Sequence, residues 1–239
     1  MARKRTEKTN FIQKSMFVRL TFVEPILGAT PNDKEIYTNY LGAQAPDAKT
    51  LQEELEDVGL TDMVEKGTNV FLSDKDGYPY LSNHVILGFF KGACGALKRV
   101  SGKPYKSSSM TAYKSKIDTL FRIEPRKIHF FQAEELNGSD QAEHIRETID
   151  VFQRPLRAST PQGDRVALAS SERLPEDTMI QFEIRLFDKA HEDVVREWLD
   201  YGFYHGIGQW RNGGFGQFEW EELDEDEYFD TLPTRLKME

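Results

Sequence analysis

Apolar and polar residues alternate in several stretches of the chain, and this pattern predicts β-strands there. Residues 16–23 are rich in β-branched and aromatic residues and stop shortly before Pro25. Residues 179–187 alternate with a period of two, and residues 127–132 and 215–223 are also strand-like. Such runs suit a pleated surface with one buried face. We therefore expect four core strands.

Two segments instead show helical periodicity. Residues 84–100 carry apolar side chains at helical spacing, with Asn83 as the expected N-cap, and residues 189–204 form an amphipathic pattern. The first helix contains Gly88, Gly92 and Gly95. Each glycine costs about 1 kcal/mol relative to alanine inside a helix. Their accumulation needs a packing reason or a ligand that approaches the backbone closely.

The order of these elements is β-α-β-β-α-β, the ferredoxin-like (RRM-like) plan, so we predict an α+β fold in a single domain spanning residues 1–239. Two long insertions, residues 24–82 and 133–177, interrupt the plan. The first should contain a short acidic helix at 47–58 and a hairpin that turns at Asp76-Gly77, and the second should contain another hairpin.

Composition excludes two classes of protein. Sixteen Phe, nine Tyr and three Trp among 239 residues are too much apolar material for a disordered chain. The longest apolar run, residues 85–96, contains Lys91 and is too short to cross a membrane, and the basic start leads into no apolar signal segment. The single cysteine, Cys94, excludes an intrachain disulfide and fits a reducing cytoplasm.

Charge is distributed unevenly along the chain. The formal net charge is −9, but residues 219–230 hold eight acidic and no basic side chains, which we interpret as a solvated face. Residues 91–127 hold ten basic side chains against two acidic ones. A solvated face would explain either run, but the basic block coincides with glycine, serine and aromatic residues, as nucleic-acid-binding surfaces do.

A glycine-rich segment, residues 206–216, follows the second predicted helix and leads into the last strand. Dinucleotide-binding loops and phosphate-binding P-loops have the reverse order, strand then glycines then helix, and the P-loop also needs a Lys-Ser/Thr pair. Neither that order of elements nor the Lys-Ser/Thr pair is present in residues 206–216. A tight turn that packs on the helix remains the alternative to a binding loop.

With this order of elements, the segment resembles the glycine-rich loop of the repeat-associated RNA-binding (RAMP) superfamily of CRISPR systems. Residues 18–28, Val-Arg-Leu-Thr-Phe-Val-Glu-Pro-Ile-Leu-Gly, are similar to the first strand of that family. Residues 87–99, Leu-Gly-Phe-Phe-Lys-Gly-Ala-Cys-Gly-Ala-Leu-Lys-Arg, are similar to the first core helix of its backbone subunits. The segment before Gly88 departs from the Pro-Gly-Ser-type turn usual in the family. Together the three segments cover about a seventh of the chain.

The resemblance implies an RNA-binding subunit of an effector complex, and the residue types fit that role. Glycines let a nucleic-acid backbone approach peptide N–H groups, while cationic and aromatic side chains supply phosphate contacts and stacking planes. The candidate RNA-binding residues are Lys91, Lys98, Arg99, Lys103, Lys106, Lys114, Gly208, Trp210, Arg211, Gly213, Gly214 and Gly216. Of these, the cations at positions 91, 98, 99 and 211 should contact phosphates rather than bases.

Two expectations follow for the loops. Residues 101–110 have no apolar periodicity and should be mobile without a ligand, because lysines and serines bury nothing that offsets the entropy of ordering. If the glycine-rich loop is a binding device, Gly214→Val should abolish RNA retention and cost less than about 1 kcal/mol of stability.

Candidate catalytic residues are few. The five histidines show no metal-ligand spacing, and we expect neither a metal nor another cofactor. His205, beside Tyr204 and Tyr201, would be the general base of a metal-independent endoribonuclease, although such a histidine is more often structural. Asp33 follows the first strand, where some RAMP backbone subunits carry an aspartate that promotes RNA cleavage.

The function best supported by the sequence is therefore RNA binding without catalysis, by a subunit that stacks head to tail along RNA or another single-stranded nucleic acid and associates with itself or with related subunits, away from membranes. Two alternatives stay open. One is a protein-interaction component or phage structural protein with the same fold, and the other is the metal-independent endoribonuclease.

Overall fold

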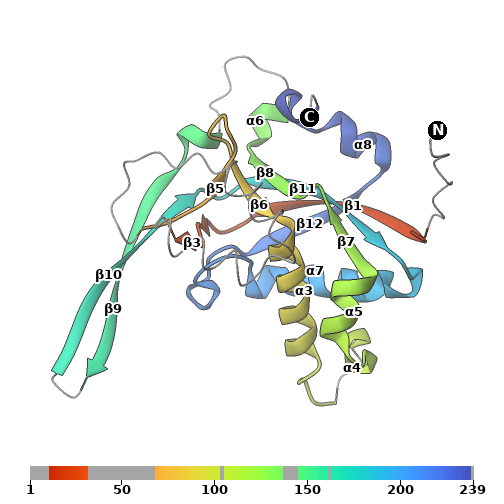
Figure 1. The fold of residues 1–239 in the computed structure, drawn as a ribbon, viewed down its shortest axis with the longest axis horizontal. Coiled ribbons are helices and arrows are strands. Elements are labelled where there is room, and N and C mark those ends of the chain that lie inside the picture. The colour runs from red at the N-terminus through yellow and green to blue at the C-terminus, as the bar shows by residue number, and fades with distance from the viewer. Residues whose placement is uncertain (1–10, 32–67, 103–104, 137–144, 161–162, 238–239) are drawn as a thin grey trace, which may run out of the picture.

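The computed structural model describes residues 11–31, 68–102, 105–136, 145–160 and 163–237. Its centre is a mostly antiparallel sheet in the spatial order β12-β1-β11-β8-β6-β5, with β7 paired to β11 beside β8 (Figure 1). The strands of this sheet are β1 (Lys14–Phe22), β5 (Leu72–Ser73), β6 (Pro79–Ser82), β7 (Phe121–Glu124), β8 (Lys127–Phe131), β11 (Met179–Leu186) and β12 (Phe218–Leu223).

The strand order confirms the ferredoxin-like plan. Strand β1 lies between β11 and β12 and is antiparallel to both, and β11 pairs on its other side with β7 and β8. The second core strand is thus two segments, and the sequence indicated only β8. Strand β7 was not predicted, because its four residues, Phe-Arg-Ile-Glu, are too few to show a clear alternation.

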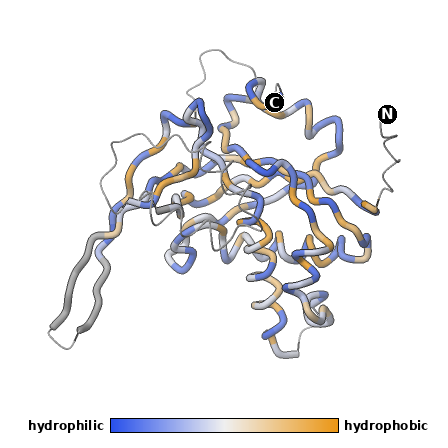
Figure 2. The backbone as a smooth tube through the Cα atoms, in the orientation of Figure 1, coloured by the Kyte–Doolittle hydropathy of each residue, from blue (hydrophilic) through white to orange (hydrophobic). Residues whose placement is uncertain are grey.

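The helices that cover one face of this sheet are α3 (Asn83–Leu97), α4 (Lys106–Ser109), α5 (Tyr113–Leu120) and α7 (Glu192–His205). The alternate residues Met16, Val18 and Leu20 of β1 point into the core between sheet and helices, where Phe90 packs against Trp198 at 5.2 Å between ring centroids. In Figure 2 apolar and polar positions interleave along the sheet strands. The period-two pattern of β1 therefore arises from a sheet with helices on one face.

The N-cap assignment was wrong. Helix α3 begins at Asn83, and its N-cap is Ser82, whose side chain makes no capping hydrogen bond. The Asn83 side chain instead donates to the carbonyl oxygen of Ile123 at 3.1 Å. This contact ties the start of α3 to β7, a strand remote in the sequence.

The insertions form a second sheet in the order β2-β10-β4-β3, with β9 paired to β10. Its strands are β2 (Ile26–Leu27), β3 (Thr30–Pro31), β4 (Thr68–Val70), β9 (Asp150–Thr160) and β10 (Gly163–Leu174). Strands β9 and β10 form the hairpin expected in the second insertion, and it projects from the body of the molecule (Figure 1). The hairpin at Gly77, formed by β5 and β6, is also present. The helix expected at 47–58 lies outside the described residues.

The eight acidic side chains of residues 219–230 are all exposed, as expected for a solvated face, and the segment itself is folded. It forms the edge strand β12 and the helix α8 (Glu225–Asp230), which lies on the face of the sheet away from α3 (Figure 1). Tyr228 of α8 packs on Phe17 at 4.9 Å between ring centroids. After α8, Arg235 in η4 (Thr234–Leu236) bonds Glu135 of α6 (Ala133–Leu136) at 3.0 Å and so fixes the C-terminal segment across the sheet.

Candidate nucleic-acid interface

The glycine-rich loop, residues 206–216, is joined by backbone hydrogen bonds into a closed turn between α7 and β12. Ile207 N donates to Gly216 O at 2.9 Å, and Gly216 N donates to Pro25 O at 2.8 Å. Gly208 lies against Ile26, whose Cγ1 would be 3.3 Å from a Cβ placed on that glycine. The loop therefore packs on the connection that follows β1.

Four glycines of the loop, Gly206, Gly208, Gly214 and Gly216, adopt positive φ, and two of them illustrate what the turn requires. Gly216 has φ +71°, and a Cβ there would lie 2.0 Å from the carbonyl oxygen of Ile207. Gly214 has φ +89°, a conformation that strains any residue with a Cβ, although the space around it is open. The tight turn that the sequence left open as an alternative thus accounts for both positions.

Trp210 stacks within the molecule. Its ring lies 5.7 Å from that of Phe152 in β9 and 5.2 Å from that of Phe215, with interplanar angles of 26° and 21°. The guanidinium carbon of Arg154 is 4.1 Å from the indole centroid, and a Cβ on Gly213 would meet the same ring at 2.7 Å. This cluster fastens the loop to the base of the β9–β10 hairpin. The next residue, Arg211, is exposed.

The glycines of α3 differ from those of the loop. A Cβ on Gly95 would lie 2.9 Å from the Tyr113 hydroxyl, so this glycine has a packing reason. Gly88 and Gly92 are exposed, and nothing lies within 4 Å of a Cβ placed on either. They are one helical turn apart and leave a bare strip of backbone on the outer face of α3.

Cations surround that strip, but several have partners within the chain. Lys91 Nζ lies 2.5 Å from Asp118 of α5. Lys98 donates to the carbonyl oxygen of Met110 at 2.6 Å and lies over the Tyr113 ring. Lys106 pairs with Asp193 at 3.2 Å, Arg99 and Lys114 are exposed, and Lys103 lies outside the described residues.

The structure does not join all these residues in one groove. Gly208 borders an apolar cavity of about 60 Å³ beside His84 and Val85, at the start of α3. Lys98 and Arg99 follow the last residue of the same helix. Because α3 has 15 residues, its two ends lie roughly 20 Å apart. The loop and the lysine cluster therefore occupy opposite ends of α3, with Gly88 and Gly92 between them.

The expectation that residues 101–110 bury nothing was wrong. Ser107 is fully buried; its hydroxyl donates to Glu197 at 2.5 Å and accepts from Trp198 Nε1 at 2.9 Å. The Glu197 carboxylate also accepts the backbone N–H groups of Lys106 and Ser107. These contacts anchor α4 to α7, a partner about ninety positions further along the chain.

Of the two catalytic candidates, only His205 is among the described residues. His205 stacks on Tyr201 at 5.0 Å between ring centroids, and burial, with a smaller contribution from Arg211, lowers the pKa of His205. Asp33 lies outside the described residues. Among the residues that the structure describes, no three His, Cys, Asp or Glu side chains are placed to hold a metal ion.

Two solved structures show what this fold is similar to. A chain of Type III-B Cmr-beta bound to cognate target RNA aligns with a TM-score of 0.46 at 8% identity, over 88% of this chain and 60% of the other. Cmr6 from Pyrococcus furiosus aligns with a TM-score of 0.43 at 9% identity, over 91% of this chain and all of the other.

We base the fold class on the strand order described above and not on these two alignments. The chain spans about 60% of the length of the Cmr-beta chain. No family model matches the sequence, and no curated protein matches it either. No helix within the described ranges is long and apolar enough to cross a membrane.

Proposed function

We propose that this chain is a non-catalytic, cytoplasmic RNA-binding subunit of the RAMP type, which holds an RNA backbone along the outer face of α3 and assembles head to tail with copies of itself or with related subunits. The observation that carries the proposal is the pair Gly88 and Gly92. Both lie in a helix interior, where each glycine lowers the stability of the helix by about 1 kcal/mol relative to alanine. Neither has a neighbouring atom that would clash with a side chain. A ligand that approaches the helix backbone closely is a reason for glycine there.

The charges around the strip support a polyanionic ligand. Arg99 and Lys114 are exposed at one end of α3, and Arg211 is exposed in the glycine-rich loop, which packs near the other end. Lys91 lies beside the strip, and its ion pair with Asp118 is half exposed, so an arriving phosphate can replace the carboxylate at little cost. Phosphate contacts position a nucleic acid without reading its sequence.

Substitutions at Gly92 test the proposal because they separate binding from folding. Gly92→Leu places a large side chain on the bare strip, so RNA affinity should fall at least tenfold while the protein stays folded. Gly92→Ala is the matched control, with the same backbone change and only a methyl group, and should bind RNA more tightly than Gly92→Leu. Equal affinity of wild type and Gly92→Leu for single-stranded RNA would refute RNA binding along α3.

A salt titration tests the role of the cations. Arg99→Gln and Lys114→Gln should weaken binding of unrelated RNA sequences about equally, and each should reduce the salt dependence of log K by roughly one for every phosphate that the variant no longer neutralises. Weakening that depends on RNA sequence would contradict a backbone-binding role. If wild-type protein retains no RNA at low salt, the protein-interaction alternative becomes the better interpretation.

A further inference from the structure

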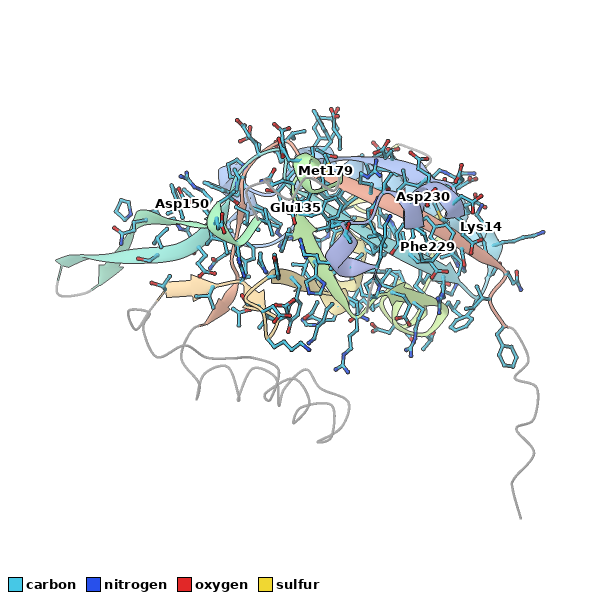
Figure 3. All side chains as sticks on the ribbon, turned by 90° about the horizontal axis from the view of Figure 1, so that it is seen from above. Lys14, Glu135, Asp150, Met179, Phe229 and Asp230 are labelled. Carbon is cyan, nitrogen blue, oxygen red and sulfur yellow. The ribbon has the colours of Figure 1, made fainter. Side chains whose placement is uncertain are left out.

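A second candidate site lies on the opposite face of the sheet. A cavity of about 330 Å³ opens between the outward side chains of β8 and β11 and the C-terminal segment that contains α8 and η4. Figure 3 views the molecule from this side, with Phe229 and Glu135 labelled. Its size is at the lower end of the range for small-ligand pockets, and α3 and the glycine-rich loop do not line it.

The floor of the cavity offers both donors and acceptors. Gln181 is 3% exposed, and its amide bonds the Thr231 hydroxyl at 2.9 Å, which links the floor to the end of α8. Glu183 pairs with Arg185 at 2.7 Å. Burial of Glu183 opposes its ionisation, but hydrogen bonds from Arg185 and Ser15 prevail and lower the pKa of Glu183, which therefore stays a carboxylate acceptor.

The walls of the cavity are aromatic and apolar. Tyr228, Phe131 and Leu232 line it, and Phe229 stands at its edge with 53% of its surface exposed. Burial, with a smaller contribution from Glu183, raises the pKa of Tyr228 to about 12, so its phenol remains a neutral hydrogen-bonding group at physiological pH. A flat apolar ring that is half exposed beside a polar floor suits a planar ligand with hydrogen-bonding edges.

The charged side chains that line the cavity indicate what charge the ligand carries. Two cations, Lys127 and Arg185, balance two carboxylates, Glu124 and Glu183, so the cavity as a whole favours neither a polyanion nor a polycation. Arg185 is 38% exposed at its side chain and can meet a phosphate at the opening without leaving its carboxylate partner. A neutral planar body with a single anionic group fits this combination.

We propose that this cavity binds one nucleotide, with the base against Phe229, its edge over Gln181 and Glu183, and the phosphate toward Arg185. Single bases commonly stack on aromatic side chains beside the open face of a sheet, and here the ring comes from α8 over that face. Here the C-terminal segment partly covers that face, so the site is a half-open cavity for one nucleotide and not an open surface for a strand. The nucleotide can be a free mononucleotide or one residue of an RNA chain.

Isothermal titration calorimetry of the full chain tests the site. The probes are the four nucleoside 5′-monophosphates, ribose 5-phosphate as a probe without a base, and 5′-phosphorylated tetranucleotides. We expect saturable one-to-one binding of at least one mononucleotide or tetranucleotide, and much weaker binding of ribose 5-phosphate. In the Gly92→Leu variant, which removes RNA binding along α3, tetranucleotides that bind at least tenfold more tightly than mononucleotides would identify an RNA chain as the source, whereas equal affinities would identify the free nucleotide.

Two variants and a matched control locate the binding. Leu232→Trp should fill the cavity and abolish binding, and Phe229→Ala, at an exposed position that folding tolerates, should weaken it at least tenfold. Phe203→Ala removes a similarly exposed ring from α7, on the other side of the sheet, and should have no effect.

Three results would overturn the proposal: no binding of any nucleotide probe, unchanged binding by both cavity variants, or ribose 5-phosphate binding as tightly as the nucleotides. Because Gly92→Leu does not touch the cavity, it should leave mononucleotide affinity unchanged. Failure of RNA binding along α3 is thereby distinguishable from failure of this site.

Discussion

The two groups of glycines in this protein, those of the glycine-rich loop and those of α3, look alike in sequence and differ in the structure. Gly214 and Gly216 adopt positive φ, and a side chain on Gly216 would collide with the backbone of Ile207. Gly88 and Gly92 adopt ordinary helical geometry with open space around them. The fold requires the first pair and not the second. Glycines without a structural reason are the better indicators of a ligand.

The largest expected effect in this comparison is that of Gly216→Ala. The new Cβ would lie 2.0 Å from a carbonyl oxygen, in a residue with φ +71°. Left-handed strain and overpacking together should cost about 3 kcal/mol or more of unfolding free energy. Urea denaturation measures this destabilisation. A cost below about 1 kcal/mol, the size of an ordinary surface effect, would mean that the turn is not needed for folding.

Gly214→Val should cost less, about 1–2 kcal/mol, because only the positive φ opposes the side chain. This revises the expectation from sequence of a cost below about 1 kcal/mol. Gly214→Asn is the matched control, because asparagine tolerates left-handed geometry, and it should recover much of the stability. Equal stabilities of the Val and Asn variants would argue against backbone strain at this position.

Gly92→Ala should stabilise the protein, in contrast to the two loop variants. With nothing within 4 Å of the new methyl group, alanine should raise the free energy of unfolding by roughly 0.5–1 kcal/mol through helix propensity. Gly95→Ala is the control, since the Tyr113 hydroxyl lies where its methyl group would go, and it should gain less or lose stability. Thermal denaturation of both variants decides the point, and destabilisation by Gly92→Ala would reveal an unseen packing constraint.

The smallest expected effect concerns the pH dependence of the glycine-rich loop. Burial, and secondarily Arg211, lowers the pKa of His205 in the folded state, so the folded protein favours the neutral imidazole. The stability from this group is therefore complete above the ordinary histidine pKa and is lost as the pH falls below it. Proton NMR titration of wild type and Arg211→Gln should show a higher His205 pKa in the variant. No difference would mean that burial alone sets it.

The sequence predicted the strands and the two large helices because their signal is local. Alternation in β1 and β11 and the apolar stripe of α3 each recur within a few residues, and the right-handed crossover of two β-α-β units leaves few arrangements. A helical projection of residues 84–100 would also have placed Gly88 and Gly92 opposite the apolar stripe. This part of the candidate site could therefore have been predicted from the sequence.

The remaining features depend on partners far apart in the chain. Ser107 is buried because Glu197 and Trp198 lie over it, and Lys91 is paired because α5 brings Asp118 to its side. Neither contact leaves a trace in the local pattern of polar residues, which is why a segment of serines and lysines was predicted to be mobile.

The sequence by itself thus determined the fold class and the basic block at residues 91–127, since periodicity and composition are properties of neighbouring residues. Only the tertiary structure decided which glycines the turn requires and which stand bare, because that depends on φ and on atoms such as Ile207 O and Tyr113 Oη that other segments bring close. It also decided that residues 225–230 form a helix over the sheet, where Tyr228 packs on Phe17 while the acidic side chains stay exposed to water.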